Sequence, residues 1–195
     1  GLNISVQADD VKIHDLNYAH MLLKGSVKKT LLTLDEVKLQ EQENVTDHGL
    51  ITVDGQIELK GQGFNLSTQA LKANPAIVTA VMKDPPEIKG EMDLNVQLAG
   101  TVDKPTGKGY LEITNGSVAG VGMDKLDAEL SLKDDTIKLD YLVATKDVYA
   151  VKAAGDIPLD VFRSKEQRRN PRAQMNILMD LNEARLGILP ALSKM

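Results

Sequence analysis

The sequence of 195 residues contains no cysteine and no tryptophan, and its only aromatic residues are two phenylalanines and four tyrosines. A chain without cysteine forms no disulfide and offers no thiolate ligand to a metal ion. Because 42% of the residues are nevertheless hydrophobic, a packed core is expected, and it must consist of Leu, Val, Ile, Ala and Met. Such an aliphatic core offers few rings on which bases or sugars can stack.

The chain also lacks a basic excess and a long apolar run. Its formal net charge of −5 argues against nucleic acid, which is bound by concentrated Lys and Arg. No segment approaches the roughly 18 consecutive apolar residues of a membrane-spanning helix, and none resembles a secretory signal. Because the chain starts at Gly1 and ends at Met195 within an apolar stretch, we expect it to be a segment of a longer protein.

Signals of catalysis and of metal binding are weak. The three histidines, His14, His20 and His48, are not spaced as metal ligands with a second histidine or a carboxylate. No Gly-x-Ser-x-Gly motif is present, and carboxylates such as Asp93 and Glu112 alternate with apolar residues as solvent-facing residues of strands do. We therefore predict no enzyme, no cofactor and no metal site.

Alternation of apolar and polar residues with a period of two dominates the sequence, which is typical of half-buried strands. In residues 92–98 every even position is apolar and every odd position is polar. Turn-forming residues at 103–105, 115–116 and 133–135 separate several such runs. The pattern predicts a mainly β chain, an elongated and curved antiparallel sheet with one or two short helices. The expected strands are Ile51–Leu59, Leu111–Val118, Leu126–Leu132, Ile137–Thr145 and Tyr149–Leu159.

Two stretches depart from this alternation. Apolar residues in Leu66–Met82 have a spacing closer to helical, and Pro75 interrupts them. Residues 182–195 look much the same. We therefore expect two short helices or one kinked helix in Leu66–Met82, and a similar helical segment in residues 182–195. The helical segment in Leu66–Met82 would either cover part of the core or shield the mouth of a groove from water.

Residues 100 positions apart match one another, as Gly55 matches Gly155, and those near Leu66 match Leu181 at an offset of 115. This suggests a repeated unit of roughly 100 residues, in which the extra positions form an inserted loop. The predicted organisation is a partial first β-repeat at 1–60, a helical excursion at 61–86, a second β-repeat at 87–162, a basic loop at 163–173, and the start of a further repeat at 174–195.

The inserted loop is strongly basic, with five cationic residues in ten. A solvated loop between strands is the favoured interpretation. The alternative is a contact for phospholipid headgroups or for an acidic partner. Its basic residues are Arg163, Lys165, Arg168, Arg169 and Arg172.

A recurring rhythm of glycine, leucine and proline runs from Gly55 to Asp160 and resembles the C-terminal region of the TamB/AsmA-like family. The resemblance implies a taco-shaped β-sheet with an apolar interior groove, in a cell-envelope protein that faces the periplasm and is anchored in the inner membrane. It also implies transport of phospholipid between the inner and outer membranes, or assembly of outer-membrane proteins with an Omp85-type partner. The motifs that carry it are Gly55–Gly61, Ile88–Gly90, Leu98–Thr101, Pro105, Gly109–Leu111 and Asn115–Val118.

The first hypothesis is therefore that apolar alternating positions line a groove for phospholipid acyl chains. The alternative is a structural or interaction scaffold whose core is closed and which holds no lipid. An enzyme acting on a small ligand is the least favoured of the three. The expected lining residues are Met92, Leu94, Val96, Leu98, Leu111, Ile113, Leu130, Leu132, Ile137 and Leu139.

Overall fold

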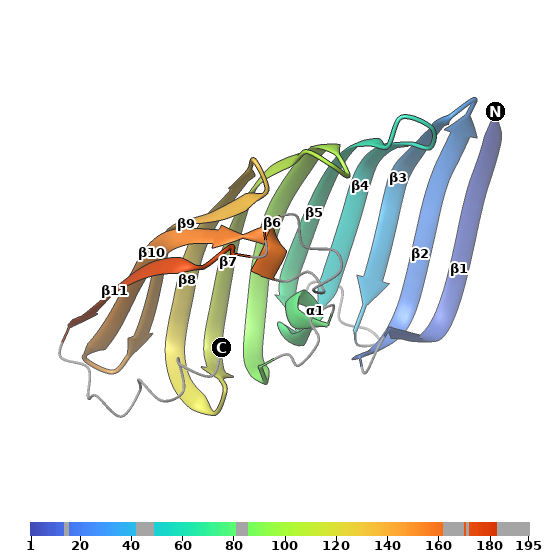
Figure 1. Cartoon of the computed structure of the whole chain (residues 1–195). Helices are drawn as coiled ribbons and strands as arrows, with labels where there is room; N and C mark the ends of the chain where they lie inside the picture. Colours follow the sequence, from blue (N-terminus) through green and yellow to red (C-terminus); the bar gives the residue numbers. More distant parts are fainter. Residues whose placement is uncertain (14–15, 42–48, 81–85, 162–169, 171, 183–195) are drawn as a thin grey trace. The chain divides into compact units, whose positions relative to one another are not determined.

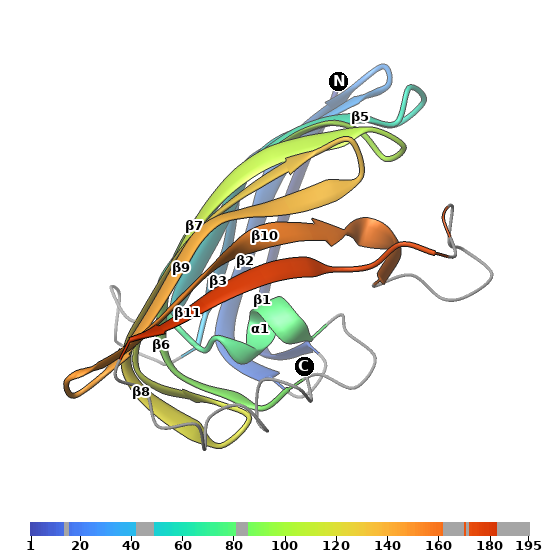
Figure 2. The ribbon, with the colours of Figure 1, turned by 60° about the vertical axis from the view of Figure 1, so that its left-hand side comes forward.

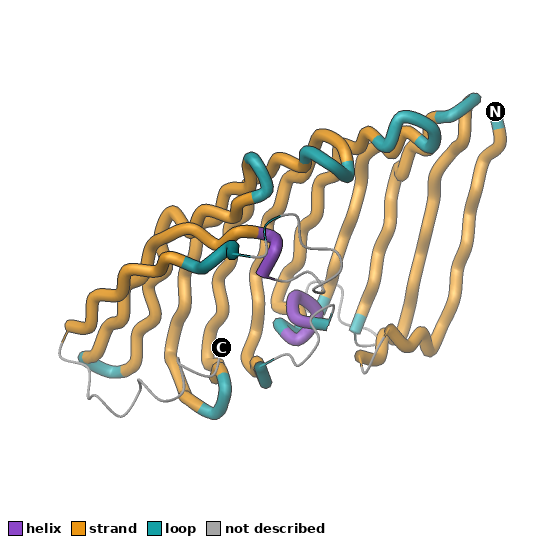
Figure 3. The backbone as a smooth tube through the Cα atoms, in the orientation of Figure 1, coloured by secondary structure: helices purple, strands orange, loops and turns teal. Residues whose placement is uncertain are grey.

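The structure, a computed structural model, describes residues 1–13, 16–41, 49–80, 86–161, 170 and 172–182. Strands make up most of these residues, and the described helices are short (Figure 3). The predicted mainly β fold is confirmed. The strands are β1 (Leu2–Ile13), β2 (Leu16–Lys28), β3 (Leu31–Gln40), β4 (Leu50–Glu58), β5 (Gly63–Ala73), β6 (Ile88–Thr101), β7 (Pro105–Val118), β8 (Val121–Lys133), β9 (Thr136–Lys146), β10 (Tyr149–Pro158) and β11 (Asn176–Asn182).

Strand pairing follows the order of the chain, from β1 to β11 (Figure 1). The pairs β1–β2 to β5–β6 and β8–β9 to β10–β11 are all antiparallel, as expected for strands joined by tight turns. Lys29, Asp134 and Asp147 have positive φ at such turns, the conformation that a two-residue hairpin connection requires. In this order β1 and β11 each have one neighbouring strand, so the described sheet is open.

The helical prediction for Leu66–Met82 is wrong in its first part, because Gly63–Ala73 form β5. β5 pairs with β4 on one side and with β6 on the other, so both neighbours satisfy its backbone, and tertiary pairing overrides the local spacing. A single helical turn, α1 (Ala76–Thr79), follows Pro75. The end of this stretch at Met82 and the predicted helix after Asn182 lie outside the described residues.

The predicted turn at Asn115-Gly116 is also wrong, because both residues lie inside β7. Asn115 has a φ of 51°, so the pair marks an irregularity within the strand rather than its end. A Cβ on Gly116 would lie 2.5 Å from the carbonyl oxygen of Lys89, which explains why glycine occupies this position. The connection to β8 comes later, at Ala119 and Gly120, and both have positive φ.

The chain divides into two compact units, each described by itself below. Unit 1 comprises residues 1–74 and 92–109, and unit 2 comprises residues 75–91 and 110–195. β6 and β7 therefore contribute residues to both units, and the division does not coincide with the predicted boundaries at 61, 87 and 163. In unit 2, β10 leads into a short 3-10 turn, η1 (Leu159–Val161), and lies beside β11 (Figure 2).

Each unit contains buried hydrophobic side chains. Those of unit 1 include Tyr18, and the Tyr18 hydroxyl has no hydrogen-bond partner among the described residues. Burial and the nearby Glu41 carboxylate raise the pKa of Tyr18 to about 12. The buried hydrophobic residues are Tyr18, Ile51, Ala70, Ala73 and Met92 in unit 1, and Ile113, Met123, Leu126, Ala128 and Leu139 in unit 2.

Gly55 in β4 and Gly155 in β10 have matching surroundings. Their φ values are 139° and 155°, and an added Cβ would lie 2.1 Å and 2.0 Å from the carbonyl oxygens of Asn65 and Asn176 respectively. Because a Cβ is excluded in both places, glycine is required by close backbone approach. The match agrees with the predicted offset of 100 at these glycines. Beyond them, however, Leu66 corresponds to Ile177 and not to the predicted Leu181.

Candidate functional site

Unit 1 gathers its aliphatic side chains on one face of its sheet. Residues directly opposite each other in antiparallel strands share a face, so the registers define four rows that cross β1 to β6. The rows contain no charged residue, and their only polar side chain is that of Thr68. They are Ala8–Met21–Leu39–Ile51–Ala70–Leu94, Val6–Leu23–Val37–Val53–Thr68–Val96, Ile4–Gly25–Leu34–Gly55–Leu66–Leu98 and Leu2–Val27–Leu32–Ile57–Phe64–Gly100.

Most side chains in these rows are half-buried. Ile51 and Ala70 are buried, whereas Leu2 and Val6 on the edge strand β1 are 64% and 43% exposed. The remaining large side chains of the rows lie between these limits. The face therefore keeps accessible aliphatic area across the sheet of unit 1. We call these four rows the unit 1 apolar face.

The opposite face of unit 1 is polar. Lys24 Nζ and Lys38 Nζ lie 2.9 Å and 2.6 Å from the two carboxylate oxygens of Glu36. The hydrogen bonds from Lys38 and Lys24 lower the pKa of Glu36 to about 2. One row of this face reads Gln7–Leu22–Lys38–Thr52–Gln69–Asn95.

Unit 2 has the same division of its faces. Its rows cross β8 to β11 and contain no charged or polar side chain; Gly155 is their only glycine. Leu126, Ala128 and Leu139 are buried, Met179 is exposed, and the other members are half-buried. The unit 2 apolar face consists of Leu126–Ala144–Val151–Leu181, Ala128–Leu142–Ala153–Met179, Leu130–Leu139–Gly155–Ile177 and Leu132–Ile137–Ile157.

Seven of the ten predicted lining residues belong to these two faces. Leu94, Val96 and Leu98 end three rows of unit 1, and Leu130, Leu132, Ile137 and Leu139 form adjacent pairs in unit 2. Met92 is fully buried beside Ala73, beyond the register shift that separates it from the rows. Ile113 is also buried and Leu111 is half-buried, both in β7.

Of the five basic residues predicted to contact headgroups, the structure describes only Arg172. Arg172 is exposed, and its backbone N–H donates to Asn170 Oδ1 over 3.0 Å. The backbone N–H of Asn170 donates in turn to the buried Asp160 carboxylate over 2.6 Å. Arg163, Lys165, Arg168 and Arg169 lie outside the described residues.

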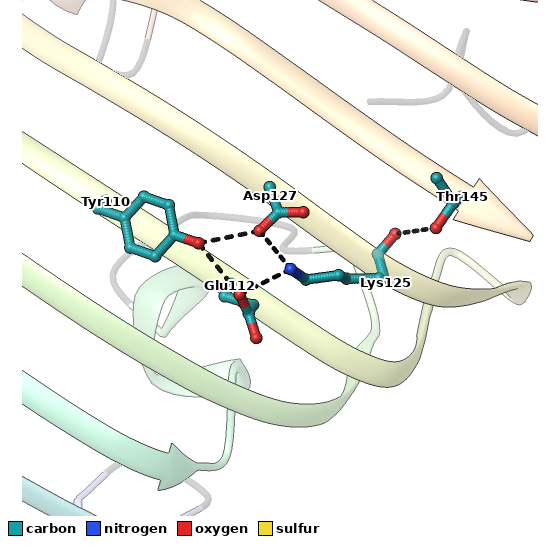
Figure 4. Close-up of polar contacts among 5 residues, drawn as sticks. All are labelled: Tyr110, Glu112, Lys125, Asp127 and Thr145. Carbon is teal, nitrogen blue, oxygen red and sulfur yellow. Dashed lines mark hydrogen bonds and ion pairs between the residues drawn. The ribbon is translucent and has the colours of Figure 1, made fainter.

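The polar face of unit 2 carries a charged network between β7 and β8 (Figure 4). Lys125 Nζ lies 3.0 Å from both Glu112 Oε2 and Asp127 Oδ1, and the Tyr110 hydroxyl lies 3.0 Å and 2.9 Å from the same two oxygens. The hydrogen bond to Asp127 is the largest cause of the raised pKa of Tyr110. Burial opposes ionisation of Asp127, but hydrogen bonds from Lys125 and Tyr110 outweigh it and lower the pKa of this carboxyl. Each carboxylate therefore already faces a cation and a hydroxyl, which favours a role in joining strands.

Sequence reasoning missed most of the unit 1 apolar face. Leu22 and Leu23 are adjacent apolar residues, which obscures the alternation in β2, although only Leu23 lies on the apolar face and Leu22 lies on the polar face. Because Leu66 was predicted to lie in a helix, the continuation of the rows through β5 was also missed. The alternation of Val6 and Ala8 with polar neighbours was a usable signal for the rest.

No group of three or more His, Asp or Glu side chains in the described part of the chain is arranged to hold a metal ion. Across the same residues, no helix is long and apolar enough to span a membrane. No protein-family model matches the chain, and neither a curated protein nor a solved structure matches it.

Proposed function

We propose that the apolar faces of this chain bind phospholipid acyl chains, as a non-enzymatic segment of a cell-envelope lipid-transport protein. The observation that carries the proposal is the segregation seen in both units: rows of half-buried aliphatic side chains on one face and charged networks on the other. Large accessible apolar area on a protein surface commonly marks a binding site. An acyl chain binds favourably to such a surface, because the surface is aliphatic and has no directional hydrogen-bonding groups.

The rows of unit 1 are suited to this ligand. Burial of each methylene group of a lipid contributes about 0.8 kcal/mol, so partial docking of one chain across several rows is sufficient for binding. Because no side chain in the rows is charged, the face has no group that fixes a ligand at a single position. It would bind acyl chains with little selectivity for their structure.

The cellular setting of the proposal comes from the resemblance to TamB/AsmA-like proteins. On that basis the full-length protein is anchored in the inner membrane, faces the periplasm, and moves phospholipid between the inner and outer membranes or assists outer-membrane protein assembly. An Omp85-type protein is the partner implied. The alternative, a structural scaffold without lipid, predicts the same sheet with no bound acyl chain.

The test is lipid extraction from the purified chain, followed by mass spectrometry, for a matched pair of variants. Thr68 lies in a row of the apolar face between Val53 and Val96, and its neighbour Gln69 lies on the polar face. Thr68→Asp places a charge among the rows and is expected to remove co-purifying phospholipid, whereas Gln69→Asp retains it. Equal lipid content in wild type and both variants, or none in any, would favour the scaffold. Circular dichroism establishes that both variants remain folded.

A further inference from the structure

Three turns of unit 1 lie side by side along one edge of its sheet, where β2 joins β3, β4 joins β5 and β6 joins β7 (Figure 1). The backbone N–H of Leu59 donates to the carbonyl oxygen of Thr30 over 2.7 Å, which connects the first two turns. The N–H of Val102 donates to the carbonyl oxygen of Gln62 over 3.3 Å, which connects the second and third. We call residues 28–31, 58–62 and 101–104 the turn rim.

The turn rim exposes large aliphatic side chains. Val102 is 66% exposed, Leu59 is 56% exposed and Leu31 is 37% exposed. Turns are usually built from Gly, Asn, Asp and Ser, so a Leu and a Val at two adjoining turns are not explained by turn geometry. Because hydrogen bonds join the three turns, these exposed side chains lie on one continuous rim, and a ligand-binding role explains them better than chance exposure of single residues does.

The same rim is basic, although the whole chain carries a net charge of −5. Lys28, Lys29, Lys60 and Lys104 are all exposed, and they outnumber the two rim carboxylates, Glu58 and Asp103. None of these four lysines forms an ion pair with another described residue. Lys24 and Lys38 elsewhere in unit 1, by contrast, both form ion pairs with Glu36.

From this juxtaposition we infer that the turn rim docks on the surface of a bilayer that contains anionic phospholipid. Lys29, Lys60 and Lys104 contact the phosphates, and Leu59 and Val102 enter the boundary between headgroups and acyl chains. Exposed aliphatic residues among lysines are the combination that holds a protein at this interface. The inference rests on the proposed function, because docking would bring unit 1 to a source of acyl chains. Vesicle binding can nevertheless be measured independently of lipid binding by the apolar face.

The test is co-sedimentation of the full chain with phosphatidylcholine vesicles, with and without phosphatidylglycerol, at low and high salt. Binding is expected only to the anionic vesicles and is expected to weaken with salt. Each lysine near an anionic surface contributes about fivefold, so the triple variant Lys29→Gln, Lys60→Gln, Lys104→Gln should bind roughly a hundredfold more weakly. Leu59→Ser with Val102→Ser should bind about tenfold more weakly through lost apolar burial.

Two controls keep the result specific. A triple variant with the same charge change away from the rim, Lys12→Gln, Lys138→Gln, Lys152→Gln, should bind almost as wild type does. Val148→Ser removes a side chain that is 75% exposed in another turn and should have no effect. The inference is overturned if the rim and control triples weaken binding equally, or if the wild-type chain does not bind anionic vesicles. If the wild-type chain does not bind vesicles but still co-purifies with lipid, the membrane-docking role of the turn rim is wrong, and the proposed binding of acyl chains by the apolar face is unaffected.

Discussion

Units 1 and 2 build the same surface from different residues. Both place uncharged aliphatic rows on one face, and both have a glycine in a row that would clash with the next strand if it carried a Cβ, Gly55 in one and Gly155 in the other. They differ on the polar face, where unit 1 holds Glu36 between two lysines and unit 2 holds Lys125 between two carboxylates. The apolar parity and the close glycine are therefore the shared requirements, whereas the charges can be exchanged.

The largest effect is expected from filling the two close-contact positions. Gly55→Ala and Gly155→Ala each place a Cβ against a backbone carbonyl at a φ that L-residues avoid, so each should lower the free energy of unfolding by about 1–3 kcal/mol from backbone strain, and more from overpacking. Urea unfolding measures the loss. Gly122→Ala is the control, because nothing lies within 4 Å of its Cβ position. A neutral effect at one of the two glycines would break the correspondence between the units.

The buried residues of the two faces offer a matched pair of cavities. Ile51 and Leu139 are each 7% exposed, one in a row of each unit. Ile51→Ala and Leu139→Ala should each cost about 2–4 kcal/mol of stability, toward the lower end because neighbouring row members stay half-exposed and the site can relax. Differential scanning calorimetry gives both values. A large loss at one position with almost none at the other would show that only one unit packs its apolar face.

Removal of a carboxylate from the charged networks should have a smaller, pH-dependent effect on stability. The pH range of this effect should differ between the polar faces of the two units. The pKa of Glu36 falls from its ordinary 4.5 to about 2 on folding, so its contribution is present above pH 4.5 and is lost as pH falls toward 2. Hydrogen bonds from Lys146 and the backbone of Asp147 lower the pKa of Asp124 below its ordinary 3.8, so its contribution is lost only below about that pH.

Glu36→Gln is therefore expected to flatten the acid limb of stability between pH 4.5 and 2, and Asp124→Asn to act only below about pH 3.8. Urea unfolding midpoints across the acid range measure both, with Asp35→Asn on the same strand as Glu36 as a control for removing one carboxylate. If Glu36→Gln and Asp35→Asn changed the acid limb equally, the lysine contacts of Glu36 would carry no stability.

Alternation in the sequence was sufficient to predict the fold class and the strands that correspond to β4 and to β6 through β10. It also placed seven of the ten predicted lining residues on the parity that forms the apolar faces. It was insufficient where two patterns fit the same residues, as in β5, where Leu66 and Ala70 satisfy both helical spacing and strand alternation. Strand pairing with β4 and β6 decided between them, and this pairing is not visible locally. The Asn115-Gly116 pair misled for a similar reason, since positive φ occurs inside strands as well as in turns.

The turn rim could not be found from the sequence because its residues come from three separate turns. Leu59, Lys60 and Val102 are unremarkable in their own segments, and only the hydrogen bonds between turns bring them together. The apolar faces were easier to predict because each strand carries its own signal. Surfaces assembled across turns therefore need the structure, whereas surfaces assembled along strands are partly visible in the sequence.

Photo-crosslinking to lipid in cells, with a probe placed at neighbouring positions of opposite parity in both units, distinguishes lipid-binding apolar faces from a lipid-free scaffold. Val96 and Leu142 lie in rows of the apolar faces, and Gln97 and Val143 lie on the polar faces. If the apolar faces bind acyl chains, phospholipid adducts form at Val96 and Leu142 and none form at Gln97 and Val143, because the face on which a residue lies, and not its hydrophobicity, decides labelling. Equal labelling at both parities, or no adduct at any of the four positions, would contradict it.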